Sequence, residues 1–282
     1  MATKKVFIGV GQGGSDPGAV SGTFKESEIN LTMALAAKAE LERHGVSVGI
    51  SRIKEEEDRL AEEIKECKAF DPDVAIECHN NAAGTSTGNG FEVYVQTGTY
   101  KAQSRKMAQA IAKRVSSEIG QELRGNDGGL RTKLNSSGTD YFGWLRQLNC
   151  PAVLLEGFFV DGVKDRLDFD TKAEQQAMGK AYAHGVLDYL GIKVKASSGS
   201  TGATVSTPAS GTMYTVQVGA FKEKKNADGV VAQLKGKGFA AMVKKVDGLY
   251  CVQAGAFKSK ANAQKLCEQL KAKGYAAIIK TK

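Results

Sequence analysis

The sequence VFIGV at residues 6–10 is a short apolar run that leads into a glycine-rich loop, and it predicts a buried β-strand. A helical pattern with one apolar face then runs from near Glu26 to Gly45, and a second apolar run begins at Val46. Strand-like and helical runs keep alternating through residue 191. This alternation predicts an α/β layer fold.

Five strands are expected in this part of the chain, each bounded by turn residues or by a helical pattern. They are Val6–Val10, Val46–Arg52, Asp73–His79, Phe91–Gln96 and Ala152–Phe159. The apolar stripes of the intervening helices are assigned to the core.

The composition is that of an ordinary globular protein, with 282 residues, 41% hydrophobic and 25% charged. It excludes a collagen, a coiled coil and a wholly disordered chain, and the length allows two domains. The net charge of +8 is unevenly distributed: residues 1–212 carry 25 basic and 27 acidic side chains, whereas residues 213–282 carry 14 lysines and 4 acidic side chains. A region this basic suggests a polyanionic partner, with solubility as the plainer explanation.

A stretch without charge separates the two regions. Residues 196–212 are mostly Ser, Gly and Thr, and they carry too little apolar surface to fold. We therefore expect a first domain over residues 1–192, a flexible linker over residues 193–212 and a second domain over residues 213–282.

The basic region contains an internal repeat with an offset of 36 residues. The stretch VQVGAFK at residues 216–222 returns as VQAGAFK at residues 252–258, and QLK at residues 233–235 returns at residues 269–271. Each copy reads as strand, helix, strand. Two copies therefore predict a small α+β domain of ferredoxin-like β-α-β-β-α-β order.

The glycine-rich loop at residues 9–14 formally fits the dinucleotide-binding pattern G-x-G-x-x-G. That pattern should open a helix at once, but residues 15–18 read as a turn and the helix begins only near Glu26. We therefore reject a nucleotide site.

Polar residues gather instead at the expected ends of strands and at the start of the first helix, where open α/β sheets place their ligands. They are Gln12 in the loop after the first strand, Glu26 at the helix start, His79 at the end of the central strand and Glu156 on the last strand. His44 and His184 are assigned to helix capping and packing, and Cys78 to packing on the strand face opposite His79.

With the motifs around them, these residues resemble the zinc-dependent N-acetylmuramoyl-L-alanine amidases of the amidase-3 type, which include phage endolysin catalytic domains. The resemblance covers about residues 4–191 and rests on GGSDPGAV at residues 13–20, HNNA at residues 79–82 and PAVLLEGFF at residues 151–159. It implies a twisted mixed sheet flanked by helices. It also implies a hydrolase that cleaves the amide between N-acetylmuramic acid and the L-alanine of the stem peptide.

The resemblance further implies a Zn²⁺ site, in which Glu26 and His79 match two of the family's ligands and Glu156 matches its catalytic acid/base. Position 12 departs from the pattern, because Gln12 stands where the family has His. A Gln amide oxygen is a neutral, weak donor beside an imidazole nitrogen, so we expect weak or absent zinc and severely reduced hydrolysis. Asn81 matches a family Asn and is expected to orient the substrate or its own loop.

The apolar neighbours of Glu156 predict a raised pKa, which suits proton transfer, and a buried salt bridge is the alternative role for this residue. Two interpretations of Gln12 stay open. In the first, the chain is a hydrolase in which one zinc ligand has been lost, naturally or by design. In the second, it is a natural pseudoenzyme that only binds peptidoglycan of the cell wall. The intact Glu26, His79 and Glu156 favour the first interpretation.

Residues 213–282 resemble the SPOR domain through YTVQVGAF at residues 214–221 and its second copy. The resemblance implies binding of peptidoglycan, especially of glycan strands without stem peptides, by the face of the sheet. The predicted glycan contacts alternate on the expected central strands; they are Tyr214, Gln217, Tyr250 and Gln253. RNA binding is the alternative for a basic domain of this topology, but the aromatic-rich RNP1 pattern is missing.

Peptidoglycan is therefore the expected partner, without nucleic acid, a membrane or an obligate protein partner. The five cysteines form no Cys-x-x-Cys pair and read as free thiols of a reducing compartment. The N-terminus shows no long apolar region of a signal peptide. We expect synthesis in the cytoplasm and action at the cell wall after lysis or passage through a membrane hole, either as a phage endolysin or as a sporulation autolysin.

Overall fold

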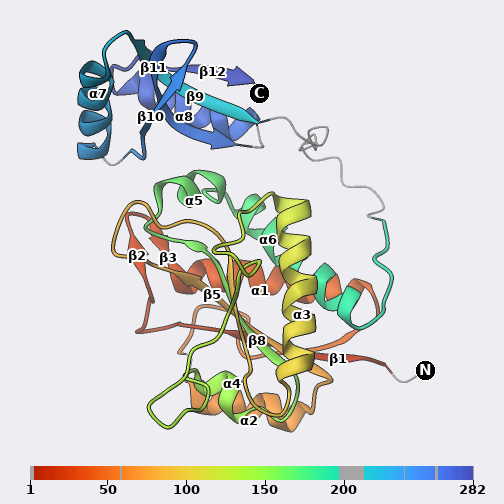
Figure 1. Cartoon of the computed structure of the whole chain (residues 1–282). Helices are drawn as coiled ribbons and strands as arrows, with labels where there is room; N and C mark the ends of the chain where they lie inside the picture. The colour runs from red at the N-terminus through yellow and green to blue at the C-terminus, as the bar shows by residue number, and fades with distance from the viewer. Residues whose placement is uncertain (1–2, 58, 197–212, 238, 258–259, 282) are drawn as a thin grey trace.

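The computed structural model describes residues 3–57, 59–196, 213–237, 239–257 and 260–281. Two sheets dominate it, one of six strands in the N-terminal part and one of four strands in the C-terminal part (Figure 1). The linker expected over residues 193–212 lies, from residue 197 on, outside the described residues.

The elements of the N-terminal part are β1 (Lys5–Val10), β2 (Val20–Ser21), β3 (Phe24–Lys25), α1 (Glu26–Arg43), β4 (Ser47–Ile50), α2 (Leu60–Phe70), β5 (Val74–Asn81), β6 (Glu92–Val95), α3 (Lys101–Arg114), the π-helical turn η1 (Val115–Ile119), β7 (Leu130–Arg131), α4 (Gly143–Gln147), β8 (Ala152–Phe159), α5 (Val163–Asp168) and α6 (Lys172–Tyr189). Those of the C-terminal part are β9 (Tyr214–Phe221), α7 (Lys224–Gly236), β10 (Met242–Val246), β11 (Leu249–Phe257), α8 (Lys260–Ala272) and β12 (Ile278–Thr281).

The large sheet has the strand order β4-β1-β5-β8-β6-β7. Strands β4, β1, β5 and β8 run parallel, and β6 pairs antiparallel with β8. The sheet is therefore mixed, and the expected α/β fold with a mixed sheet between helices is confirmed. Because β1, β5 and β8 are parallel neighbours, their carboxyl ends meet at one edge of the sheet.

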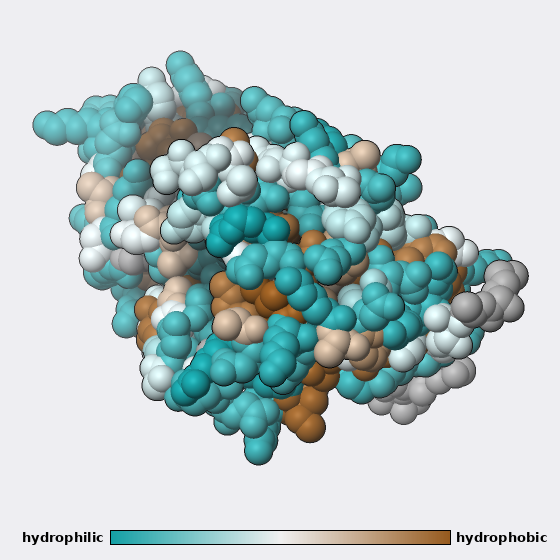
Figure 2. Space-filling model, turned by 90° about the horizontal axis from the view of Figure 1, so that it is seen from below, coloured by the Kyte–Doolittle hydropathy of each residue, from teal (hydrophilic) through white to brown (hydrophobic). Residues whose placement is uncertain are grey.

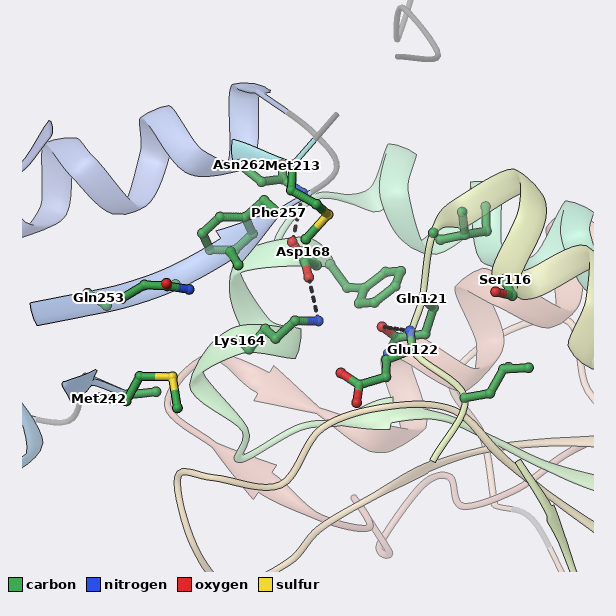
Figure 3. Close-up of a pocket in the computed structure, with 18 of the residues that line it drawn as sticks. Ser116, Gln121, Glu122, Lys164, Asp168, Met213, Met242, Gln253, Phe257 and Asn262 are labelled. Carbon is green, nitrogen blue, oxygen red and sulfur yellow. Dashed lines mark hydrogen bonds and ion pairs between the residues drawn. The ribbon is translucent and has the colours of Figure 1, made fainter. Parts of the chain in front are cut away.

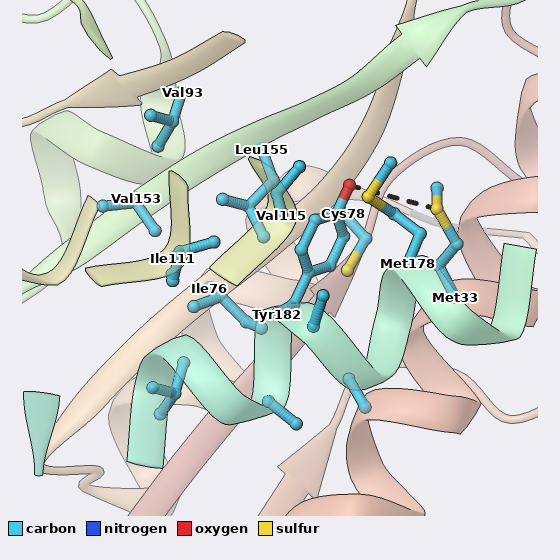
Figure 4. Close-up of a cluster of buried hydrophobic side chains, with 14 of the residues drawn as sticks. Met33, Ile76, Cys78, Val93, Ile111, Val115, Val153, Leu155, Met178 and Tyr182 are labelled. Carbon is cyan, nitrogen blue, oxygen red and sulfur yellow. Dashed lines mark hydrogen bonds between the residues drawn. The ribbon is translucent and has the colours of Figure 1, made fainter. Parts of the chain in front are cut away.

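The two faces of this sheet are covered by different helices, and strand alternation sorts the apolar residues between them. Val6 and Ile8 of β1 join the large cluster under α1, α3 and α6, whereas Phe7 joins a smaller cluster with residues of α2 and α4. The larger cluster appears in Figure 4, where Tyr182 of α6 lies beside Cys78 and two methionines. Cys78 is fully buried there, as its position opposite His79 predicts.

Hydrophilic side chains cover most of the face seen in Figure 2, and the brown apolar groups form separate patches between them. Such scattered apolar surface is usual for a globular protein. Among the described residues, no helix is both long enough and apolar enough to cross a bilayer.

The small sheet has the order β10-β11-β9-β12 with both helices packed against it, so the predicted β-α-β-β-α-β domain is confirmed. The two copies of the repeat supply β9 and β11 as neighbouring central strands. One copy alone would supply only half of the strands and one of the two helices, so it could not cover its own sheet.

The C-terminal domain contacts the N-terminal domain through helices α5 and α8. Leu167 of α5 is only 6% exposed and belongs to the apolar cluster of the C-terminal domain. Asn262 Nδ2 donates to Asp168 Oδ1 at 2.8 Å. Lys265 Nζ lies 2.6 Å from Asp170 Oδ1 and 3.3 Å from Glu174 Oε1. A lysine of the basic domain thus meets carboxylates of the nearly neutral domain.

A cavity of about 790 Å³ lies beside this contact and is lined by both domains. Figure 3 shows Asp168 between Lys164 and Asn262 at its wall, with Gln253 and Met242 on the C-terminal side and Gln121 and Glu122 on the other. None of the four polar residues expected at the strand ends lines this cavity.

The domain contact yields a first prediction. The substitution Lys265→Glu places a third carboxylate opposite Asp170 and Glu174, and it should raise the population of separated domains about fivefold, the equivalent of about 1 kcal/mol. Small-angle X-ray scattering of the full chain would measure this as a larger radius of gyration.

The control is Lys224→Glu, which makes the same change of charge on α7, where the lysine pairs with Asp228 of its own helix. The double substitution Lys265→Glu, Asp170→Lys should restore the compact form. Identical scattering from wild type and Lys265→Glu would contradict an ionic contribution to the contact.

Candidate functional site

The carboxyl ends of β1, β5 and β8 surround a second cavity, of about 580 Å³. The four residues singled out from the sequence all line it: Gln12, Glu26, His79 and Glu156. Asn81 lines it as well, and Trp144 of α4 and Phe142 just before that helix form part of its wall. Topology has brought together residues that lie up to 144 positions apart in the chain.

The loop after β1 packs directly against the imidazole of His79. A Cβ atom at Gly11 would lie 2.1 Å from two atoms of the His79 ring, so only glycine fits at this position. The next residue, Gln12, has a φ of 64°, in the left-handed region. A Cβ at Gly18 would meet both Gln12 Cγ and Glu26 Oε2, which places these two side chains next to each other.

Glu26 opens α1 and is only 5% exposed. Its Oε1 lies 3.0 Å from Nδ1 of His79, and its Oε2 accepts the backbone N–H of Ala19 at 2.9 Å. Burial pushes the pKa of Glu26 upward, but the bond to His79 and the backbone donors of Ala19 and Asn80 outweigh it, so the pKa lies below its usual value. Glu26 is therefore held as a carboxylate facing the cavity.

Two buried asparagines fix the strand ends around Glu26. Asn30 donates to the carbonyl oxygen of Gly11 at 2.8 Å, and Asn80 donates to Oδ1 of Asn30 at 2.8 Å. Oδ1 of Asn80 in turn accepts the backbone N–H of Phe158 in β8 at 3.2 Å. The chain of bonds joins β1, α1, β5 and β8, and so it sets the positions of Gln12, Glu26, His79 and Glu156 relative to one another.

Glu156 pairs in register with His79 on β5 and with Glu92 on β6, so the three side chains share one face of the sheet. Its Oε2 is buried without a hydrogen-bond partner among the described residues. Burial raises the pKa of Glu156 to about 8, with the charges of Glu26, Glu92 and Glu77 adding to it and that of His79 opposing it. The raised pKa expected from the apolar neighbours is confirmed.

Glu92, although next to Glu156, is neutralised by two arginines. Arg131 Nε lies 2.9 Å and Arg124 Nε 3.2 Å from Glu92 Oε1. The Nδ2 of Asn81 donates to Glu92 Oε2 at 3.0 Å. Asn81 is thus anchored at the cavity wall by a fixed carboxylate, and Glu156 is the carboxyl group in this row that remains available for chemistry.

Sequence reasoning missed Glu77, which also lines the cavity and is 4% exposed. Its Oε1 lies 3.5 Å from Nε2 of His79. Burial opposes protonation of His79, but the two carboxylates of Glu77 and Glu26 outweigh it and raise the pKa of His79 well above its usual value. The sequence does indicate Glu77, because it lies two residues before His79 on an expected strand and the alternation of side chains along a strand places both on one face.

The other two histidines lie outside this cavity. His44 caps α1, and its ring accepts the backbone N–H of Lys195 at 2.8 Å. His184 lies between Glu118 and Glu40, at 2.7 Å and 3.0 Å, so its place is an ionic contact between helices and not the core packing expected from its helix pattern. Among the residues that the structure describes, no group of three or more His, Cys, Asp or Glu side chains is arranged to hold a metal ion.

The predicted glycan contacts of the C-terminal domain divide between the two faces of its sheet. Tyr214 and Tyr250 pack against the apolar cluster on the helix side. The cause is the period of two, since residues three apart on a strand point to opposite sides. Gln217 and Gln253 face each other across β9 and β11.

Those two glutamines belong to a row that crosses the whole sheet. Gln253 pairs with Met242 on β10, and Gln217 pairs with Ile278 on β12. Met242 is 59% exposed and Ile278 is 48% exposed. The open face, meaning the side of the sheet away from its helices, thus presents two amides between two exposed apolar side chains, and Gln253 and Met242 of this row also line the cavity between the domains.

Comparison with known proteins agrees with the geometry of both domains. Residues 6–188 match the N-acetylmuramoyl-L-alanine amidase family, and residues 210–281 match the SPOR domain. The chain is 33% identical over 247 residues to the sporulation-specific N-acetylmuramoyl-L-alanine amidase of Bacillus subtilis (strain 168), covering 85% of this chain and 84% of the relative. It is 28% identical over 250 residues to the endolysin of Bacillus phage SPP1, covering 86% and 85%.

A solved structure shows the same N-terminal fold. The catalytic domain of CwlV, the N-acetylmuramoyl-L-alanine amidase of Bacillus (Paenibacillus) polymyxa var. colistinus, superimposes with a TM-score of 0.59 at 28% identity, covering 68% of this chain and all of the other. The match of the family to most of the N-terminal domain, together with the cavity at the strand ends, leads to one assignment. The chain belongs to the N-acetylmuramoyl-L-alanine amidase family and carries a C-terminal SPOR domain.

Proposed function

We propose that the cavity at the ends of β1, β5 and β8 hydrolyses the amide between N-acetylmuramic acid and the L-alanine of the stem peptide in peptidoglycan. The observation that carries this proposal is Glu156, a half-buried residue with a pKa of about 8 whose buried Oε2 has no hydrogen-bond partner among the described residues. A group that changes its protonation state near neutral pH suits general acid and base catalysis. The names of the relatives support the choice of substrate.

We propose a weakly held Zn²⁺ ion as the cofactor. Glu26 Oε1 and His79 Nδ1 are 3.0 Å apart, so both would be able to hold the same ion. Gln12 lies beside Glu26 and offers a neutral amide oxygen as the third donor. This set fits a divalent cation, but it holds zinc less firmly than a set with a second imidazole.

The residues that line the cavity would have distinct roles in the hydrolysis. A zinc ion bound there would polarise the amide carbonyl and acidify a water molecule. In its deprotonated form, Glu156 accepts a proton from the attacking water and returns it to the leaving nitrogen of L-alanine. Asn81, which donates a hydrogen bond to Glu92, forms a fixed part of the cavity wall next to the substrate. Phe142 and Trp144 limit the access of bulk water on the opposite side.

A second candidate function is that of a wall-binding protein without catalysis, and Gln12 is the observation that favours it. With a neutral third donor, the site loses affinity for zinc and hydrolysis falls with it. In both candidates we propose that the SPOR domain holds the chain on glycan strands, with Gln217 and Gln253 on its open face as the contacts.

Restoring the imidazole separates the two candidates. Gln12→His should increase hydrolysis of purified cell walls by more than tenfold, because even loss of a residue behind a ligand commonly costs about 10–100-fold. Histidine is also well tolerated at the left-handed φ of this position. Turbidity loss and newly released amino groups of L-alanine measure the gain.

Gln12→Leu is the matched control, because it removes the amide without supplying a ligand, and it should show no gain. If the Gln12→His variant releases no amino groups while binding zinc in a 1:1 ratio, the catalytic proposal is wrong and the wall-binding function remains.

The raised pKa of Glu156 has a consequence for stability. Its folded-state pKa of about 8 exceeds the ordinary 4.5, so protonated Glu156 favours the folded state, and this contribution is complete below pH 4.5 and lost as the pH rises through 8. Between pH 5 and pH 9 the free energy of unfolding should therefore fall less in Glu156→Gln than in the wild type. The difference should be on the order of a few kcal/mol.

Urea unfolding of both metal-free proteins at the two pH values measures the difference. The same substitution should lower hydrolysis by about 10²–10⁴-fold. Glu66→Gln, at an exposed position of α2, is the control and should follow the wild type in both measurements. Parallel pH profiles for wild type and Glu156→Gln would show that burial does not hold the proton on Glu156.

A further inference from the structure

Glu77 is a buried carboxylate at the cavity to which the mechanism above gives no role. It lies on β5 two residues before His79, on the same face of the strand, and it is 4% exposed. Its neighbours in register on the adjacent strands are Gly9 and Leu154, which carry no side-chain donor. Burial of a carboxylate in such surroundings is costly unless a specific partner compensates for it.

The partner is the imidazole of His79, whose ring lies between two carboxylates. Nδ1 faces Glu26 Oε1 at 3.0 Å, and Nε2 faces Glu77 Oε1 at 3.5 Å. The longer distance suits an ion pair and is at the limit for a hydrogen bond, and contacts of this kind commonly tighten when a site is filled.

The two nitrogens cannot serve the same purpose. A cation binds the lone pair of one ring nitrogen, and the other nitrogen keeps its proton and needs an acceptor. Because Glu26 lies on the Nδ1 side, a cation shared by Glu26 and His79 binds at Nδ1. Glu77 is then on the far edge of the ring, where it cannot be a ligand of that ion but can accept the proton of Nε2.

We propose that Glu77 is a positioning residue that accepts the Nε2–H of His79, so that the free lone pair of Nδ1 points toward Glu26 and the cation. A carboxylate behind a ligating histidine fixes the ring and increases its basicity. In this chain Glu77 therefore offsets part of the affinity that is lost with the neutral donor Gln12. This inference rests on the cation site of the proposed function.

The first measurement is the affinity for Zn²⁺ by isothermal titration calorimetry of the full chain. Glu77→Gln keeps the size of the side chain but is a weaker acceptor, and it should lower the affinity about 10–100-fold. Glu156→Gln is the matched control, because it makes the same change of side chain in this cavity without touching Nε2 of His79. Equal losses in the two variants would mean that the contact with Nε2 has no special part in the affinity, which would overturn the proposal.

The second measurement does not depend on zinc. In a ¹H–¹⁵N NMR spectrum of the metal-free protein, the Nε2–H of His79 should resonate far downfield and exchange slowly with water. Glu77→Gln should move this signal upfield and speed its exchange, and Glu156→Gln should leave it in place. An unchanged signal in Glu77→Gln would overturn the role of Glu77.

The two measurements also separate this inference from the proposed function. If the wild type binds no zinc, the cofactor proposed above is wrong, and the NMR signal still decides whether Glu77 holds the ring. If the wild type binds zinc and Glu77→Gln keeps both its affinity and the signal, the cation site stands and the role of Glu77 is wrong.

Discussion

The contact between Gly11 and the ring of His79 is the constraint on which the site depends. It requires the loop after β1 to pass so close to the end of β5 that no side chain fits between them. The parallel pairing of β1 with β5 and of β5 with β8 brings the three strand ends to that point, and the asparagines Asn30 and Asn80 then join them by hydrogen bonds. The cavity and its carboxyl groups follow from this arrangement.

Around one imidazole the site gathers more negative charge than the sequence motifs suggested. Glu26 and Glu77 contact its two nitrogens, and Glu156 lies beside it on the next strand. Each carboxylate makes ionisation of the next one harder, which is part of the reason that Glu156 keeps its proton near neutral pH. A cation would relieve this repulsion and so lower the pKa of Glu156.

Much of the site could be predicted from the sequence, because strand ends and a helix start are visible as changes of hydrophobic period. Glu26, His79 and Glu156 were found in this way, and Glu77 could have been found by the same alternation. The hydrogen bonds of Asn30 and Asn80 could not, since they depend on how α1 packs against β5 and on the irregular pairing of β5 with β8 between His79 and Asn81. In the small sheet, Tyr214 and Tyr250 pack on the helix side and Gln217 and Gln253 on the other side, a division that depends on strand bounds the sequence shows only approximately.

The contact between the domains was also invisible in the sequence, because α5 is a short helix whose apolar residues resemble those of any core helix. Its Leu167 completes the apolar cluster of the other domain. An N-terminal domain produced by itself would present this leucine to water, next in sequence to the acidic Asp168. Leu167 is therefore kept from water only while the C-terminal domain is in place.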